Sequence, residues 1–301
     1  MITVFGSINI DLAMPVGRLP APGETMLCPT YEMVPGGKGA NQALAAARAG
    51  ADVRMVGRVG GDAMTEPALS LMRAGGVDLA SIEAGKQSTG CAAVWIDGAG
   101  ENAIVVASGA NQEVTADQVP DEALGPEAIL ILQMEVRPEE NWAAIRRAKA
   151  SGARVMLSVA PAAPVPDEIL DQIDFLLINQ VEGAAVAAAA GISPGDDSEL
   201  PGLLASRHDL VCVMTLGPDG VLAAGPDGVH RVPALKIEPV DTTGAGDAFA
   251  GCLAAALDGG GDLASALRFA TVGAGLACTV LGAQTSLATR AAIEARLADL
   301  A

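Results

Sequence analysis

A glycine-rich segment in the last quarter of the sequence combines an anion-binding backbone with a carboxylate. It reads Asp241-Thr-Thr-Gly-Ala-Gly-Asp247, and apolar residues follow it at helical spacing, so we predict that it opens a buried helix. The amides of Gly244, Ala245 and Gly246 can then converge on one oxyanion, and the helix N-terminus adds a partial positive charge. Asp247 would lie beside that anion. The same residues also suit an ordinary helix N-terminus, so the segment alone leaves both interpretations open.

A second glycine-rich segment, Gly36-Gly-Lys-Gly-Ala-Asn-Gln42, also opens a predicted helix, which Gly50 is placed to end. The sequence contains no Gly-x-x-x-x-Gly-Lys-Ser/Thr, and no Gly-x-Gly-x-x-Gly follows the first predicted strand. The second absence disfavours a Rossmann dehydrogenase. We therefore predict a different architecture, in which the two segments face one cleft and hold a phosphate and a polyol.

Five polar residues are candidates for binding the polyol, because each follows a predicted strand or opens a predicted helix at one end of the sheet. A carboxylate accepts hydrogen bonds from two vicinal hydroxyls, and an amide both donates and accepts. The candidates are Asn9, Asp11, Lys38, Asn41 and Glu135. Taken singly, each has an ordinary alternative as a surface acid, a helix cap or a solvated charge.

Two further segments lie where predicted strands end. Asn179-x-x-Glu182 opens a helix, and its spacing is that of a capping box. Thr215-Leu-Gly-Pro-Asp-Gly220 runs from a strand into a turn, which is typical of a hairpin. Neither segment indicates a function by itself.

The elements that must position these residues alternate along the chain. We predict strands at 2–8, 53–56, 128–133, 153–157, 174–178 and 210–215, with helices at 64–74, 138–150, 180–190, 197–206, 262–280 and 289–300. This order indicates βαβ units and a mostly parallel sheet. Prolines break residues 12–34, and strands at 90–96 and 102–107 flank a turn signal at 97–100. These parts are predicted to form a small separate sheet within a single 1–301 domain.

Composition excludes several classes of partner. The 301 residues carry 18 basic and 36 acidic side chains, a net charge of −18 that would repel nucleic acid and anionic membrane. Five widely spaced cysteines, mostly in apolar runs, suggest buried thiols of a reducing compartment. The first residues lack the basic and apolar regions of a signal segment, and we find no membrane-spanning pattern. We expect a cytoplasmic protein.

Taken together, these segments resemble the ribokinase (PfkB) family of ATP-dependent carbohydrate kinases over nearly the whole chain. The family's order is followed by Gly6-Ser-Ile-Asn-Ile-Asp11, Pro22-Gly-Glu-Thr25, Gly36–Gln42, Ser88-Thr-Gly90, Gly100-Glu-Asn102, Gly109-Ala-Asn111, Asn179-x-x-Glu182, Thr215-Leu-Gly217, Asp241–Asp247 and Gly282-Ala-Gln-Thr-Ser286. The resemblance implies a three-layer α/β/α fold with a mostly parallel sheet. It also implies a small β-sheet lid, at about 12–34 and 88–107, that makes a homodimer contact.

The resemblance also implies roles for individual residues. Asp247 would be the catalytic base, and the amides of Gly244, Ala245 and Gly246 would form the anion hole. The sugar-binding set would be Asn9, Asp11, Gly37, Lys38, Asn41, Glu135 and Asp247. The nucleotide set would be Asn179, Glu182, Thr215, Gly217, Gly220, Gly246 and Thr271, where Glu182 acts through water and Mg²⁺, and Thr271 replaces the family's usual His or Asn near adenine. A K⁺ site would use Asp241, Thr243, Ala277, Val280, Gly282 and Ser286.

We therefore expect transfer of the γ-phosphoryl group of ATP to the primary hydroxyl of a pentose, with ribose as the first choice and the 5-phosphate as product. Two alternatives stay open at this point. The protein would be a kinase of another sugar or of a nucleoside in the same family, or a sugar-binding sensor that keeps the fold without turnover.

Overall fold

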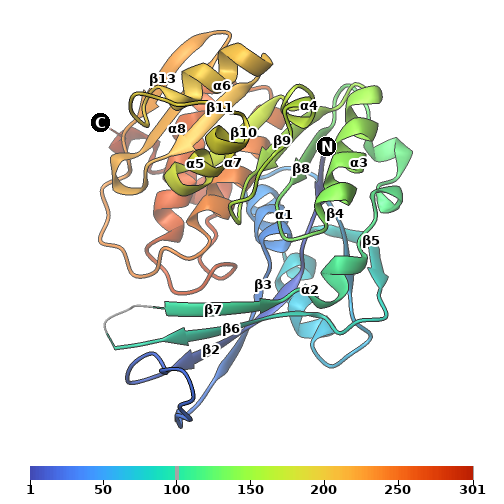
Figure 1. Cartoon of the computed structure of the whole chain (residues 1–301), viewed down its shortest axis with the longest axis vertical. Coiled ribbons are helices and arrows are strands. Elements are labelled where there is room, and N and C mark those ends of the chain that lie inside the picture. Colours follow the sequence, from blue (N-terminus) through green and yellow to red (C-terminus); the bar gives the residue numbers. More distant parts are fainter. Residues whose placement is uncertain (99–101, 301) are drawn as a thin grey trace.

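The computed structural model describes residues 1–98 and 102–300, and within them a nine-stranded sheet forms the centre of the molecule (Figure 1). Its strand order is β13-β12-β11-β10-β9-β8-β1-β4-β5. Neighbouring strands run parallel from β11 to β5, whereas β12 and β13 are antiparallel. The strands are β1 Ile2–Phe5, β4 Val53–Val59, β5 Asp78–Ala84, β8 Ile129–Leu132, β9 Arg154–Ser158, β10 Phe175–Asn179, β11 Val211–Thr215, β12 Val221–Gly225 and β13 Gly228–Val232.

Helices cover both faces of this sheet, as the alternation of side chains in β8 shows. Ile129 and Ile131 belong to one buried apolar cluster, while Leu130 and Leu132 belong to another. Strands buried on both faces are continuously apolar for this reason. The first cluster includes residues of α1 Lys38–Arg48, α2 Thr65–Ala74, α7 Ala245–Asp258, α8 Leu263–Ala277 and α9 Arg290–Glu294. The second includes residues of α3 Pro138–Ala150, α4 Asp167–Leu170, α5 Gln180–Ala189 and α6 Leu200–His208. The predicted three-layer α/β/α class is confirmed.

A second sheet lies below the main body in Figure 1 and, in the described part of the chain, has four strands in the order β3-β2-β6-β7. The strands are β2 Asn9–Pro15, β3 Glu32–Gly36, β6 Gly90–Ile96 and β7 Asn102–Ala107. The chain passes from β1 of the central sheet into β2 within three residues, so the two sheets meet at the start of β2. Part of the turn predicted at 97–100, and of the 100–102 segment, lies outside the described residues.

The packing of α1 against α7 brings the two glycine-rich segments together. Both helices begin directly after a glycine, α1 after Gly37 and α7 after Gly244, and both lie on the same face of the sheet. Their contacting faces are largely alanine, which allows a close approach. The starts of α1 and α7, which come from distant parts of the sequence, therefore lie close together.

Two elements differ from the sequence prediction. Strand β5 was not expected; it follows α2 directly and pairs with β4 at the edge of the sheet, where its side chains are only partly buried. The final helix is much shorter than 289–300, because α9 ends at Glu294 and a separate 3₁₀ turn spans Leu297–Asp299. In the described part of the chain, no helix has the length and apolar character needed to cross a membrane.

Candidate active site

Asp247 lies in the first turn of α7 and connects it to α1. Its side chain is buried, with only 6% of the residue exposed. Asn41 donates its Nδ2 amide to Oδ2 at 2.9 Å, and Gln42 donates Nε2 to Oδ1, also at 2.9 Å. Asp247 is also the main cause of a raised pKa of Lys38, so a carboxylate and an ammonium face each other here. The two glycine-rich helix starts therefore meet at one buried carboxylate.

The backbone that is predicted to form the anion cradle comes directly before Asp247. Gly244 is left-handed, with φ of 76°, and immediately precedes Ala245 and Gly246, which start α7. All three line a cavity together with Lys38, Asn179, Glu182 and Asp247, and Ser158 of β9 lies on its wall. Amides at a helix start, beside an ammonium, suit the binding of a phosphoryl group.

The polyol candidates are held in place by two residues that sequence reasoning did not select. Asn111 donates its amide to the Oδ1 atom of Asn9 at 2.7 Å, and also bonds to the backbone of Ile8 in both directions. Ser7 donates its hydroxyl to Glu135 Oε2 at 2.6 Å, and the same oxygen accepts the Lys38 amide at 3.1 Å. Both residues belong to segments that carry the family resemblance, which was the signal available for them.

Asp11 on β2 lies among like charges. Burial, followed by the nearby carboxylates of Glu135 and Asp247, raises its pKa to about 6, against the opposing effect of Lys38. The folded protein therefore binds this proton more tightly than the unfolded chain does. Ionisation of Asp11 therefore destabilises the folded state. This destabilisation is absent well below pH 4, grows as the pH rises, and is complete above about pH 6.

This pKa predicts opposite effects of Asp11→Asn on stability and on sugar binding. The ionised carboxylate is the form that accepts two hydroxyls, so the KM for the sugar should rise as the pH falls below about 6. In Asp11→Asn we expect a higher KM that no longer changes over this range, together with a higher Tm at pH 7 without ligands. Sugar KM profiles and thermal melts measure both. A variant with wild-type KM and an unchanged pH profile would remove Asp11 from the sugar site.

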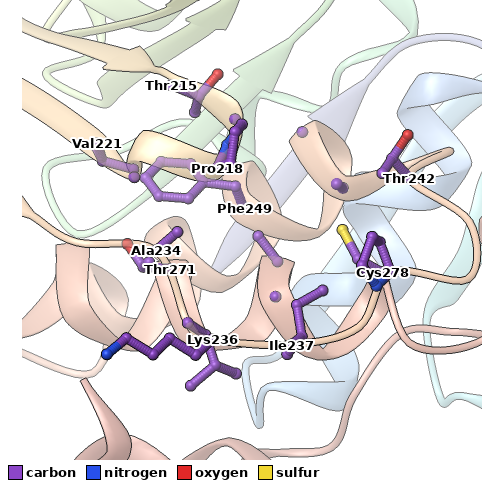
Figure 2. A pocket seen from close by; sticks show the side chains of 18 residues that line it. Thr215, Pro218, Val221, Ala234, Lys236, Ile237, Thr242, Phe249, Thr271 and Cys278 are labelled. Carbon is purple, nitrogen blue, oxygen red and sulfur yellow. The ribbon is translucent and has the colours of Figure 1, made fainter. Parts of the chain in front are cut away.

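Five of the seven nucleotide candidates line a neighbouring, larger cavity of about 520 Å³ (Figure 2). Thr215, Pro218 and Val221 line one side, and Ala234, Lys236 and Ile237 come from the chain that leads to α7. Gly217, Gly220, Gly246 and Thr271 also line it. Thr271 is buried and donates its hydroxyl to the carbonyl of Leu267, within its own helix. The cavity is mostly apolar and suits a flat ring system better than a sugar.

Asn179 and Glu182 form the capping box that their spacing suggests, and also line the anion cavity. Asn179 Oδ1 accepts the Glu182 amide at 2.9 Å, and Glu182 Oε2 accepts the Asn179 amide at 2.8 Å. Burial raises the pKa of Glu182 despite these bonds. The structural and the functional interpretations of this pair are therefore compatible.

Hydrogen bonds connect three of the six cation candidates, Asp241, Thr243 and Gly282. Asp241 Oδ1 accepts the amide of Thr243 at 2.9 Å, and Oδ2 accepts the amide of Gly282 at 2.8 Å. The amides of Val240 and Asp241 both donate to the carbonyl of Cys278, next to Ala277. Ser286 is buried and bonds to the Ala283 carbonyl, while Val280 is about half exposed. Among the described residues, no cluster of three His, Cys, Asp or Glu side chains could hold a metal ion. The Asp241 carboxylate therefore links Thr243 to Gly282, and the bonds to Cys278 hold this segment against the end of α8.

Comparison with known proteins identifies relatives over the full length of the chain. The sequence pattern of the pfkB family carbohydrate kinases matches residues 1–290. The ribokinase of Bacillus subtilis (strain 168) is 34% identical over 295 residues, covering 97% of this chain and 98% of that protein. A crystal structure of ribokinase from Thermotoga maritima has a TM-score of 0.91 at 31% identity, covering 99% of both chains. Arabidopsis thaliana ribokinase complexed with ribose and ATP has a TM-score of 0.86 at 29% identity, covering 98% of both.

Proposed function

The chain belongs to the pfkB family of carbohydrate kinases, and on this premise we propose that it transfers the γ-phosphoryl group of ATP to the 5-hydroxyl of D-ribose. The observation that supports this most directly is the position of Asp247. Its carboxylate lies at the junction of a backbone anion cradle, a lysine and a set of polar residues suited to hydroxyls. The larger apolar cavity next to the cradle provides room for a nucleotide base.

Asp247 acts as the general base in the proposed reaction. It accepts the proton of the sugar hydroxyl as the oxygen bonds to the γ-phosphorus and the bond to the leaving ADP oxygen breaks. The amides of Gly244, Ala245 and Gly246 stabilise the charge on the transferred group without reorganising, because the helix start already fixes them. Lys38 adds a positive charge on the side of α1. Asn9, Asp11, Gly37, Asn41 and Glu135 hold and orient the sugar.

Two cations are part of the proposal. Magnesium bound to the nucleotide phosphates would neutralise charge, and Glu182 would hold it through water, since Mg²⁺ usually keeps several waters and few protein ligands. The residue set of Asp241, Thr243, Ala277, Val280, Gly282 and Ser286 would hold K⁺, mostly through main-chain oxygens. Such a cation would orient the backbone dipoles beside the anion cradle. Asn179, Thr215, Gly217, Gly220, Gly246 and Thr271 would line the nucleotide site.

The small sheet is proposed to act as a lid over the sugar and as a dimer contact. Its edge strand β7 exposes Ile104, Val105 and Val106, of which Val105 is 61% exposed. An open apolar edge of this kind favours pairing with a second copy of the chain. Sedimentation would then give a dimer, and Val105→Lys would give a monomer; a wild-type monomer would contradict the contact.

We also propose a cytoplasmic location, because all five cysteines are free thiols, as in a reducing compartment.

ADP release with a panel of acceptors tests the proposed function. We expect the highest kcat/KM with D-ribose, with product identified as the 5-phosphate by ³¹P NMR, and higher rates in K⁺ than in Na⁺. The panel includes 2-deoxy-D-ribose, D-fructose and adenosine. Preference for fructose or adenosine would replace ribose as the substrate while keeping the chemistry. Absence of ADP formation with every acceptor in the panel would favour a sugar-binding sensor without turnover.

A further inference from the structure

Two fully buried glutamines connect the candidate base to the centre of the main sheet. Gln42 of α1 donates its amide to Asp247 Oδ1 at 2.9 Å. Gln133, directly after β8, donates its own amide to Gln42 Oε1 at 2.8 Å. Both glutamine residues are 0% exposed. The bonds therefore run in series from Gln133 through Gln42 to the carboxylate.

The chemistry of the three groups fixes the direction of this series. An ionised carboxylate only accepts hydrogen bonds, so Gln42 must present its NH₂ group to Asp247 and its carbonyl oxygen to Gln133. Gln133 must then present its NH₂ group to Gln42. The carbonyl oxygen of Gln133 points instead toward Gly6, where an added Cβ would lie 1.9 Å from it. The lack of a side chain at Gly6 therefore makes room for this orientation.

The orientation is costly for folding alone. Gln133 Oε1 is buried and has no hydrogen-bond partner among the described residues. An unpaired buried carbonyl destabilises the folded state, and an apolar side chain of similar size would fill the same space without that cost. Folding stability alone therefore does not account for these two polar side chains.

We propose that Gln42 and Gln133 are positioning residues that hold the carboxylate of Asp247 in the orientation that accepts the proton of the sugar hydroxyl. This inference rests on the proposed role of Asp247 as general base. Gln42 fixes the plane of the carboxylate together with Asn41, and its hydrogen bond favours the charged form. Gln133 acts through Gln42 by preventing the amide from rotating and presenting its oxygen to Asp247.

The charged groups around Asp247 give this hydrogen bond its importance. Lys38 faces it from α1, and the carboxylates of Asp11 on β2 and Glu182 on α5 act on it in the opposite sense. Two carboxylates and one ammonium group therefore surround the Asp247 carboxylate. Neutral amide donors stabilise its negative charge without bringing a further ionisable group into the site.

The test uses Gln42→Leu, Gln133→Leu and the double variant in the full-length protein, with ATP and the best acceptor from the panel. For Gln42→Leu we expect kcat to fall about tenfold or more, and the acid limb of the kcat/KM profile to move up by roughly one pH unit. The shift is upward because loss of a donor makes the charged carboxylate less stable. Gln133→Leu should shift the limb in the same direction by less. The double variant should match Gln42→Leu, because Gln133 acts only through Gln42.

Asn141→Leu is the matched control. Asn141 is equally buried and next to this series, but its amide donates to the backbone carbonyl of Gln133 and not to a side chain of the series. We expect it to lower Tm without moving the acid limb. Additive losses of kcat in the double variant, with the limb unmoved in every variant, would overturn the proposal. If Gln42→Leu does not fold, the acid limb of the kcat/KM profile of Gln133→Leu tests the proposal instead.

Asp247→Asn, measured alongside, separates this inference from the proposed function. Full turnover in Asp247→Asn would show that residue 247 is not the base. Loss of turnover in Asp247→Asn, combined with wild-type profiles in both leucine variants, would leave the base in place and remove only the positioning role of the glutamines.

Discussion

Asp247→Asn is expected to lower kcat by at least about 10²–10⁴-fold, the usual contribution of a positioned general base. Asparagine has nearly the same shape as aspartate but does not accept a proton at neutral pH. The KM for the sugar should stay within a few-fold of the wild-type value, because the other polyol-binding residues keep their places. Steady-state ADP release, with both substrates varied, measures the two parameters separately.

The matched control for this substitution is Asp258→Asn. Asp258 is the last residue of the same helix, and its carboxylate pairs with the terminal amine of Met1 at 2.8 Å, far from the cradle. The same change of an acid to its amide should leave kcat unaltered there. Turnover of Asp247→Asn within tenfold of wild type would contradict the assignment of the base.

The chemistry of each helix start was predictable from the sequence because it depends on neighbouring residues. Glycines before Asp247 and before Lys38 allow tight turns ahead of a helix, and in the structure Gly244 and Gly37 both have positive φ and precede α7 and α1. The Asn179 and Glu182 pair is likewise local, and forms the expected capping box. The sequence did not decide between structural and functional roles for this pair, and in the structure it both forms the capping box and lines the cavity beside Asp247.

Contacts between distant segments were not predictable in the same way. Ser7 bonds to Glu135 and Asn111 bonds to Asn9, and neither pair has a spacing that local pattern could reveal. In the sequence, Gln42 was identified only as the last residue of a glycine-rich segment. Its bond to Asp247 depends on how α1 packs against α7. Strand β5 was missed for a related reason, since edge strands are weakly patterned and are defined by their partner.

Gly37→Ala is expected to lower kcat/KM for the sugar by about two orders of magnitude, because it displaces the side chains of the site by about 1 Å. Gly37 has φ of 90°, and a Cβ there would lie 2.7 Å from the Asn9 amide nitrogen and 2.9 Å from the Ser7 carbonyl oxygen. Both are backbone atoms, so no side-chain rotation relieves the collision. The start of α1, with Lys38, must move away from strand β2, which carries Asn9 and Asp11.

Gly76→Ala separates this collision from backbone strain. Gly76 has a similar φ of 79°, yet among the described residues no atom lies within 4 Å of an added Cβ, and it lies between α2 and β5, outside the site. Alanine there should cost about 1–2 kcal/mol of stability and leave kcat/KM unchanged. Equal kinetics for the two alanine variants would mean that the close approach of α1 to the β1–β2 connection does not control the site. A larger rise in the sugar KM than in the ATP KM for Gly37→Ala would place the damage on the sugar side of the cleft, because Gly37 contacts the strand that carries Asn9 and Asp11.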